Sequence, residues 1–128
     1  MRDRVVIETI SAVTLKTSDM RRAVAFYRTL GFVLRYGGEE ASFTSFSVGA
    51  TFLNLEHAAQ SGSSWGRVVF YVSDVDALHQ RALAAGLRPS TRPRDAQWNE
   101  RFFHISDPDG HELSFAQPLG SGPLERRV

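Results

Sequence analysis

The chemistry open to this chain is set by its histidines, its carboxylates and its lack of cysteine. It holds four histidines, 14 Asp and Glu residues and no Cys. Without cysteine, disulfides, thiol catalysis and thiolate-bound zinc are excluded. A metal site would therefore have to be built from His, Asp and Glu side chains.

His104 is the histidine best suited to act on a ligand. It lies in the segment RFFHIS beside Phe102 and Phe103, where a strand would turn it toward a cleft as a hydrogen-bond donor or a base. A packed histidine bonded to its neighbours is the competing interpretation. The other three are expected at solvated positions: His57 in a linker, His79 on a helix surface and His111 beside a hairpin turn.

Composition bounds the class of protein. The 128 residues are 42% hydrophobic, which suffices for one core and not for two. A formal charge of +1 provides no overall field that would attract nucleic acid or an anionic membrane. The longest apolar run, Val68 to Val72, is far shorter than the roughly 20 residues of a membrane span. Because MRDRVVIETI is too weakly apolar for a signal peptide, we expect a cytoplasmic protein without nucleic-acid or membrane partners.

Two similar segments lie 55 residues apart and must position these side chains. VTLKTSD begins at Val13 and VVFYVSD at Val68, and Gly31 and Gly86 keep the same spacing. Each copy predicts an apolar strand, an Asp that caps a helix, a helix and a glycine that ends it. The side chains expected in the core are Val13, Leu15, Thr17, Ala23, Val24, Phe26, Tyr27 and Leu30, and in the second copy Val68, Phe70, Val72, Val75, Leu78, Ala82 and Leu83.

Strand-like segments follow each glycine. After Gly31 they form a three-stranded meander over residues 32–36, 42–48 and 51–56. After Gly86 a strand starts at Leu87, a loop rich in Pro and Arg covers 88–100, and a hairpin over 101–106 and 111–117 turns at Asp107-Pro108-Asp109-Gly110. The order βαβββ therefore occurs twice in a single domain of residues 1–128, which divides into module one (10–56), a linker (57–66), module two (67–118) and a loose tail (119–128).

The doubled βαβββ unit resembles the vicinal oxygen chelate superfamily. The motifs that carry the resemblance are FYRTLGF, from Phe26 to Phe32, and DPDGHELSF, from Asp107 to Phe115. This superfamily includes glyoxalase I, extradiol dioxygenases, fosfomycin resistance enzymes and bleomycin resistance proteins. The resemblance covers Ile10 to Pro118 and implies an α+β fold, in which two modules in a pseudo-twofold arrangement form a curved mixed sheet around a cleft.

The resemblance also implies four metal-ligand positions, one on the first and one on the last strand of each module. On the first strands they fall on Ala12 and Arg67, and on the last strands, four residues after Gly49 and Gly110, on Leu53 and Ser114. Three of these side chains are not ligands for such a metal, and the guanidinium of Arg67 would repel a cation. We therefore expect no metal and no cofactor at the usual site.

Side chains two residues apart on a strand point to the same face, so neighbours of the four metal-ligand positions are also expected on the cleft wall. Arg67 offers a planar donor fork suited to a carboxylate, a phosphate or a conjugated carbonyl, and an ion pair with Glu112 is its alternative role. Trp98 ends the long 88–100 loop, a predicted lid, and its indole would stack on a flat ligand or pack over the sheet edge. The predicted ligand-binding residues are Arg67, Tyr71, Trp98, Thr14, Ser114 and Glu112, with Leu53 and Leu55 on the same wall.

Two functions compete on this basis. The first is a metal-free homodimer that binds or sequesters a small organic molecule, a drug or a metabolite, as in antibiotic resistance. The second is a metal-dependent lyase, isomerase or dioxygenase whose ligands have moved to Glu56, His104, Glu112 or His111. A third option is metal-free acid–base catalysis, with Glu112 or His104 as the candidate catalytic residues.

Overall fold

The computed structural model describes residues 5, 8–60, 65 and 67–120. Part of the predicted linker (61–64 and 66) and most of the predicted tail (121–128) lie outside the described residues. The helices among the described residues contain ten residues each, and neither is long and apolar enough to cross a membrane.

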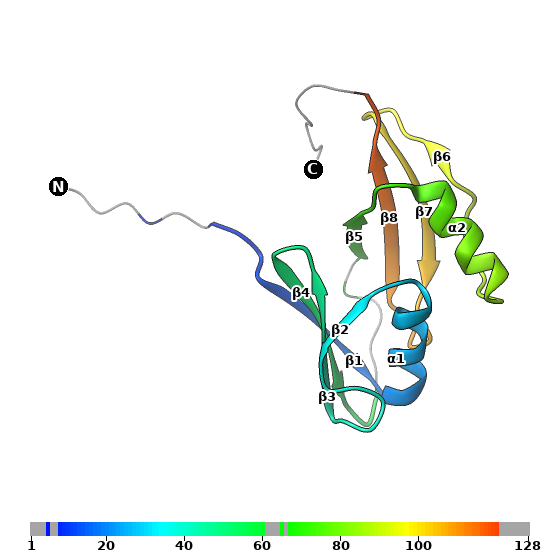
Figure 1. Ribbon diagram of the computed structural model, residues 1–128. Helices are drawn as coiled ribbons and strands as arrows, with labels where there is room; N and C mark the ends of the chain where they lie inside the picture. The colour runs from blue at the N-terminus through cyan, green and yellow to red at the C-terminus, as the bar shows by residue number, and fades with distance from the viewer. Residues whose placement is uncertain (1–4, 6–7, 61–64, 66, 121–128) are drawn as a thin grey trace.

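Ten elements form two βαβββ modules (Figure 1). The first module consists of β1 (Ala12–Thr17), α1 (Met20–Thr29), β2 (Val33–Tyr36), β3 (Phe43–Val48) and β4 (Thr51–His57). The second consists of β5 (Arg67–Tyr71), α2 (Val75–Ala84), β6 (Arg94–Asp95), β7 (Glu100–Ser106) and β8 (Glu112–Pro118). The strands are ordered β1-β4-β3-β2 in the first sheet and β5-β8-β7-β6 in the second, so the two modules have the same topology. In each module the strand that comes first in the chain pairs in parallel with the strand that comes last. The predicted α+β fold is confirmed.

The two helices begin and end where the sequence predicts. The carboxylates of Asp19 and Asp74 accept hydrogen bonds of 3.1 and 3.0 Å from backbone N–H groups of the first helical turns. Gly31, at φ +102°, follows the end of α1, a conformation that other residues rarely adopt. These local signals fix the path from each first strand back to its sheet.

The helix-facing sides of both sheets share one aromatic core. The Phe32 ring makes an edge contact with Phe70 at 5.1 Å, and Phe115 stacks on Phe70 at 5.3 Å. Tyr27 and Phe46 extend this cluster into the first module. Figure 1 shows α1 beside the ends of β7 and β8, so the helix of one module also packs near the other sheet.

Module two departs from the predicted strand at Leu87. Residues 87–93 follow β7 without forming a ladder, because Pro89 and Pro93 have no N–H to donate. Ser90 donates one backbone bond to the carbonyl of His104, at 2.8 Å, and the hydroxyl of Thr91 accepts from the backbone N–H of His104 at 3.0 Å. The regular edge strand is reduced to the two residues of β6.

Two predicted surface histidines are buried, so these predictions were wrong. His79 is 8% exposed and meets the Phe103 ring at 5.1 Å, whereas Leu83, expected in the core, is 48% exposed. On α2 the buried positions 75, 79 and 82 share one face, and Leu83 is turned away from it. His111 is 2% exposed because the β7–β8 turn docks on module one, where its Nε2 lies 2.8 Å from the carbonyl oxygen of Lys16. His57 is exposed, as expected, but it is the last residue of β4 and not part of the predicted linker.

Candidate functional site

The register of the first sheet corrects one predicted site position. Leu53 pairs with Val13 and Leu55 with Leu15, and these leucines are 1% and 0% exposed in the core. The predicted placement of both on the cleft wall was therefore wrong. Asn54 instead lies opposite Thr14, and its amide donates to the Thr14 hydroxyl at 3.3 Å.

The error has a simple geometric cause. Ala12 pairs with Phe52, whereas its counterpart Arg67 pairs with Glu112. The position equivalent to Ser114 is thus Asn54, one residue later than the count from the turn glycine predicts. A shift of one residue along a strand moves a side chain to the opposite face of the sheet.

Most of the predicted ligand-binding residues lie on one surface, which we call the outer face of the second sheet. It consists of side chains that point away from the core: Arg67, Val69 and Tyr71 from β5, Glu112, Ser114 and Ala116 from β8, and Glu100, Phe102 and His104 from β7. β8 lies between β5 and β7 and contributes two small side chains, Ser114 and Ala116. Both are buried between the larger side chains of the two flanking strands. The outer face therefore has a narrow floor of Ser114 and Ala116.

A chain of hydrogen bonds crosses one end of this face. Arg67 forms an ion pair with Glu112, Nη2 to Oε1 at 2.6 Å, which was its predicted alternative role. Its Nη1 also makes a long contact of 3.5 Å with the Ser114 hydroxyl, which lies 2.6 Å from Nδ1 of His104. A guanidinium only donates, so Ser114 accepts from Arg67, which leaves the Ser114 proton available to Nδ1; we assign the bond in this direction. The neutral imidazole of His104 then carries its proton on Nε2.

The electrostatics of the outer face favour that neutral imidazole. Burial lowers the pKa of His104 below its ordinary value of 6.5, and the nearby positive charges of Arg67 and Arg94 lower it further. The carboxylate of Glu112 acts in the opposite direction and does not cancel these effects. His104 therefore faces the surface as a neutral hydrogen-bond donor at pH 7.

Aromatic side chains occupy the other end of the outer face. Trp98 lies almost parallel to the Phe102 ring, with centroids 6.4 Å apart, and remains 41% exposed. The guanidinium of Arg94 lies 5.3 Å from the centroid of the same Phe102 ring. Glu100, only 3% exposed, accepts hydrogen bonds from the Trp98 indole, at 3.0 Å, and from the Tyr71 hydroxyl.

A tight hairpin holds Trp98 in this position. Residues 96–99 connect β6 to β7, and the backbone N–H of Ala96 donates to the carbonyl of Glu100 at 2.7 Å, which leaves residues 97–99 as the loop. Asn99 adopts a left-handed conformation at φ +68°, which asparagine tolerates better than most residues and which closes such three-residue loops. Part of the predicted 88–100 lid is thus a paired edge strand with Trp98 in its loop.

Sequence reasoning did not identify Glu100 and Arg94 as parts of the site. The signal for Glu100 was its even spacing from Phe102 and His104, which places all three on one face of a strand. Arg94 carried no comparable signal, because the strand that contains it is only two residues long. Thr14 lies on the outer face of the first sheet, and no hydrogen bond among the described residues joins it to the second sheet.

A cavity of about 380 Å³ separates the two sheets next to the outer face. Arg67, Val69 and Tyr71 border it from β5, and Phe52 borders it from β4. Trp65, predicted to pack between the modules, also lines this cavity and is largely exposed. The same β5 side chains therefore contribute to the outer face and to an adjoining, mostly apolar cavity.

The residues at the family's metal positions do not fit a metal ion. They are Ala12, Asn54, Arg67 and Ser114, with the guanidinium of Arg67 directed at the Ser114 hydroxyl. No group of three or more His, Cys, Asp or Glu side chains suited to a metal occurs in the described parts of the chain. The proposed relocated ligands have other neighbours: His104 bonds Ser114, Glu112 pairs with Arg67, His111 lies against the Lys16 carbonyl, and Glu56 is exposed on β4.

The fold and this face together define a two-module protein of the glyoxalase type. The model of the Glyoxalase/Bleomycin resistance protein/Dioxygenase superfamily matches residues 9–115. The chain belongs to this superfamily.

Individual proteins agree with that assignment. A bleomycin resistance protein from Geobacillus stearothermophilus is 26% identical over 131 residues, covering 87% of this chain and 98% of the relative. The crystal structure of a glyoxalase/bleomycin resistance protein/dioxygenase from Nocardioides is 25% identical, with a TM-score of 0.71, and the match covers 98% of this chain and 93% of that one.

A higher identity occurs over a shorter segment. An uncharacterized protein from Mycobacterium bovis is 46% identical over 48 residues, which cover 38% of this chain and 32% of that protein. The chain thus matches about a third of the length of this mycobacterial relative.

Proposed function

We propose that this chain binds a small organic molecule, a drug or a metabolite, without a metal ion, on the outer face of the second sheet. The observation that carries the proposal is the contact between Arg67 and Ser114, which stand at two of the family's metal-ligand positions. A guanidinium there repels a cation and attracts hydrogen-bond acceptors. The exposed aromatic ring of Trp98 and the adjoining apolar cavity add the surface that an organic ligand requires.

A relative named as a bleomycin resistance protein supports drug binding as the kind of role. The charges argue against bleomycin itself, because proteins that hold that cationic ligand are typically acidic and this chain has a formal charge of +1. Arg67 and Arg94 both border the outer face and would disfavour a cationic ligand. Sequestration of a different drug or metabolite in the cytoplasm is the role we propose.

The proposal includes a homodimer. β1 and β5 are edge strands of their sheets, so each leaves one backbone edge without a sheet partner among the described residues. Val69 and Tyr71 are each 44% exposed along β5, next to the cavity between the sheets. A second copy would cover this apolar edge, and sedimentation velocity should find a dimer at micromolar concentration. A monomer at every concentration would contradict this part of the proposal.

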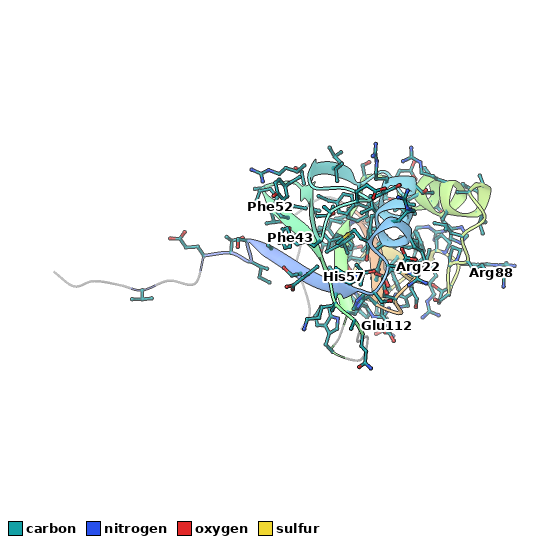
Figure 2. The ribbon with its side chains drawn as sticks, turned by 90° about the horizontal axis from the view of Figure 1, so that it is seen from below. Arg22, Phe43, Phe52, His57, Arg88 and Glu112 are labelled. Carbon is teal, nitrogen blue, oxygen red and sulfur yellow. The ribbon has the colours of Figure 1, made fainter. Side chains whose placement is uncertain are left out.

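Metal analysis and thermal denaturation test the metal-free function. Protein purified without chelators should contain far less than one metal ion per chain, and EDTA should leave its melting temperature unchanged. A library of organic metabolites and drugs should include compounds that raise the melting temperature. Arg67→Gln should remove this effect, whereas Arg88→Gln, a matched control that extends into solvent (Figure 2), should retain it. Stoichiometric metal that EDTA removes with loss of stability would overturn the proposal.

A further inference from the structure

The outer face of the second sheet has donors at one end and aromatic rings at the other. We propose that its ligand is a planar aromatic carboxylate, held by Arg67 and His104 through the carboxylate and by Phe102 and Trp98 through the ring. This inference rests on the proposed function and names the class of molecule that the site takes. It follows from the order of these side chains along the sheet.

The donor end has unused hydrogen-bonding capacity. A guanidinium has five N–H donors, and the acceptors that Arg67 meets among the described residues are the carboxylate of Glu112 and the hydroxyl of Ser114. When Nδ1 of His104 accepts the proton of Ser114, Nε2 carries the ring proton, and the residue as a whole is partly exposed. Arg67 and His104 thus lie on either side of one hydroxyl, and both offer N–H groups to an acceptor above it.

The aromatic end lies within the reach of a small ligand. Phe102 and His104 are two residues apart on β7, about 7 Å along the strand, and their rings are 5.0 Å apart. Ala116, opposite Phe102, is small and only 1% exposed, because larger side chains on the flanking strands cover it. A one- or two-ring acid has the length to place its carboxylate over Ser114 while its ring lies against Phe102 and Trp98.

The sign of the ligand's charge follows from which charged groups on the outer face already have hydrogen-bond partners. Glu100 is engaged by the Tyr71 hydroxyl and the Trp98 indole, while the guanidinium of Arg94 adds positive charge beside Phe102. Glu112 is half exposed and occupies only part of the Arg67 fork. It therefore competes with a ligand carboxylate for Arg67, and removing its charge should favour an anionic ligand.

Three naphthalene probes that share one ring system test the inference. Calorimetry with 2-naphthoate, 2-naphthalenemethanol and 2-naphthylmethylamine should show the carboxylate binding about tenfold more tightly than the amine, since charge-assisted hydrogen bonds form only with the acid. Glu112→Gln should tighten 2-naphthoate severalfold and weaken the amine. Trp98→Ala should weaken all three probes, and Arg88→Gln should change none. Melting curves check that each variant is folded.

The outcomes separate this inference from the proposed function. If the amine binds as tightly as the acid, or if Glu112→Gln weakens 2-naphthoate, the ligand class is wrong while small-molecule binding stands. If library compounds bind at Arg67 but no naphthalene probe does, the class is also wrong. If no organic compound binds at all, both the proposed function and this inference are wrong.

Discussion

The hydroxyl of Tyr27 donates a hydrogen bond of 2.7 Å to Oδ2 of Asp107, and the bond joins the helix of module one to the β7–β8 turn of module two. Both side chains are buried. The second carboxylate oxygen of Asp107 accepts from the backbone N–H groups of Asp109 and His111, each at 2.9 Å. Asp107 therefore shapes its own turn and fixes that turn to the other module.

Replacing Tyr27 by Phe should destabilise the protein by about 1–3 kcal/mol, because the buried Oδ2 of Asp107 loses its donor. Urea denaturation of the wild type and Tyr27→Phe measures the difference in free energy of unfolding. The matched control is Tyr36→Phe, which removes a hydroxyl from an exposed ring and should cost little. Equal effects of the two substitutions would show that the bond between the modules contributes nothing to stability.

The elements of this fold were predictable because their signals are local. Asp19 and Asp74 lie immediately before their helices, and Gly31 lies immediately after one, so each acts on a backbone only a few residues away. The repeat at a spacing of 55 residues and the DPDG turn are also contained in short segments. For this reason the predicted strands over 51–56 and 111–117 agree closely with β4 and β8, and both predicted helices occur after their capping Asp residues.

The parts that failed depend on contacts between distant segments. Leu53 and Asn54 exchange faces according to which residue of β4 meets Ala12, and that register is set by pairing across some 40 residues. His111 looks solvated beside its own turn and is buried by Lys16 in the other module. Glu100 is part of the site because it accepts a hydrogen bond from Tyr71, which lies on another strand. No local pattern contains such information.

Acidification should destabilise the protein through His104. Its pKa in the folded protein lies below 6.5, chiefly because of burial, so as the pH falls below 6.5 the unfolded chain binds the proton first. Stability should therefore be unaffected by His104 above pH 6.5 and should decline between 6.5 and the folded pKa. His104→Gln, which cannot titrate, should lack this contribution. A wild-type minus variant difference that stays constant from pH 7.5 to 4.5 would contradict the prediction.

The left-handed backbone at Asn99 predicts a specific sensitivity to β-branching. Asn99→Val should cost about 1–2 kcal/mol more than Asn99→Gly, because a branched side chain clashes at φ +68° and glycine does not. Thermal denaturation measures the costs, and tryptophan fluorescence reports whether the neighbouring Trp98 leaves its position. Gln97→Val, at an exposed site in the same loop, is the control. Similar costs for valine at 97 and 99 would mean that the loop conformation is not demanding.

The buried carboxylate of Glu100 should make the Tyr71 hydroxyl important for stability as well as for the site. Tyr71→Phe removes one of the donors to Glu100, and a charged acceptor that is 3% exposed is costly to leave unsatisfied. The expected loss is about 1–3 kcal/mol in the free energy of unfolding.

A double-mutant cycle with Glu100→Gln shows whether that loss comes from the charge. In the Glu100→Gln background the Tyr71→Phe substitution should cost much less, because the amide is neutral and the Tyr71 hydroxyl can also accept from its NH₂ group. The Trp98 indole, which bonds the other oxygen of Glu100, serves as an internal control through its fluorescence. If Tyr71→Phe costs the same in both backgrounds, the charge of Glu100 does not hold Tyr71. The contribution of the Tyr71 hydroxyl would then come from a hydrogen bond that does not depend on the charge of Glu100.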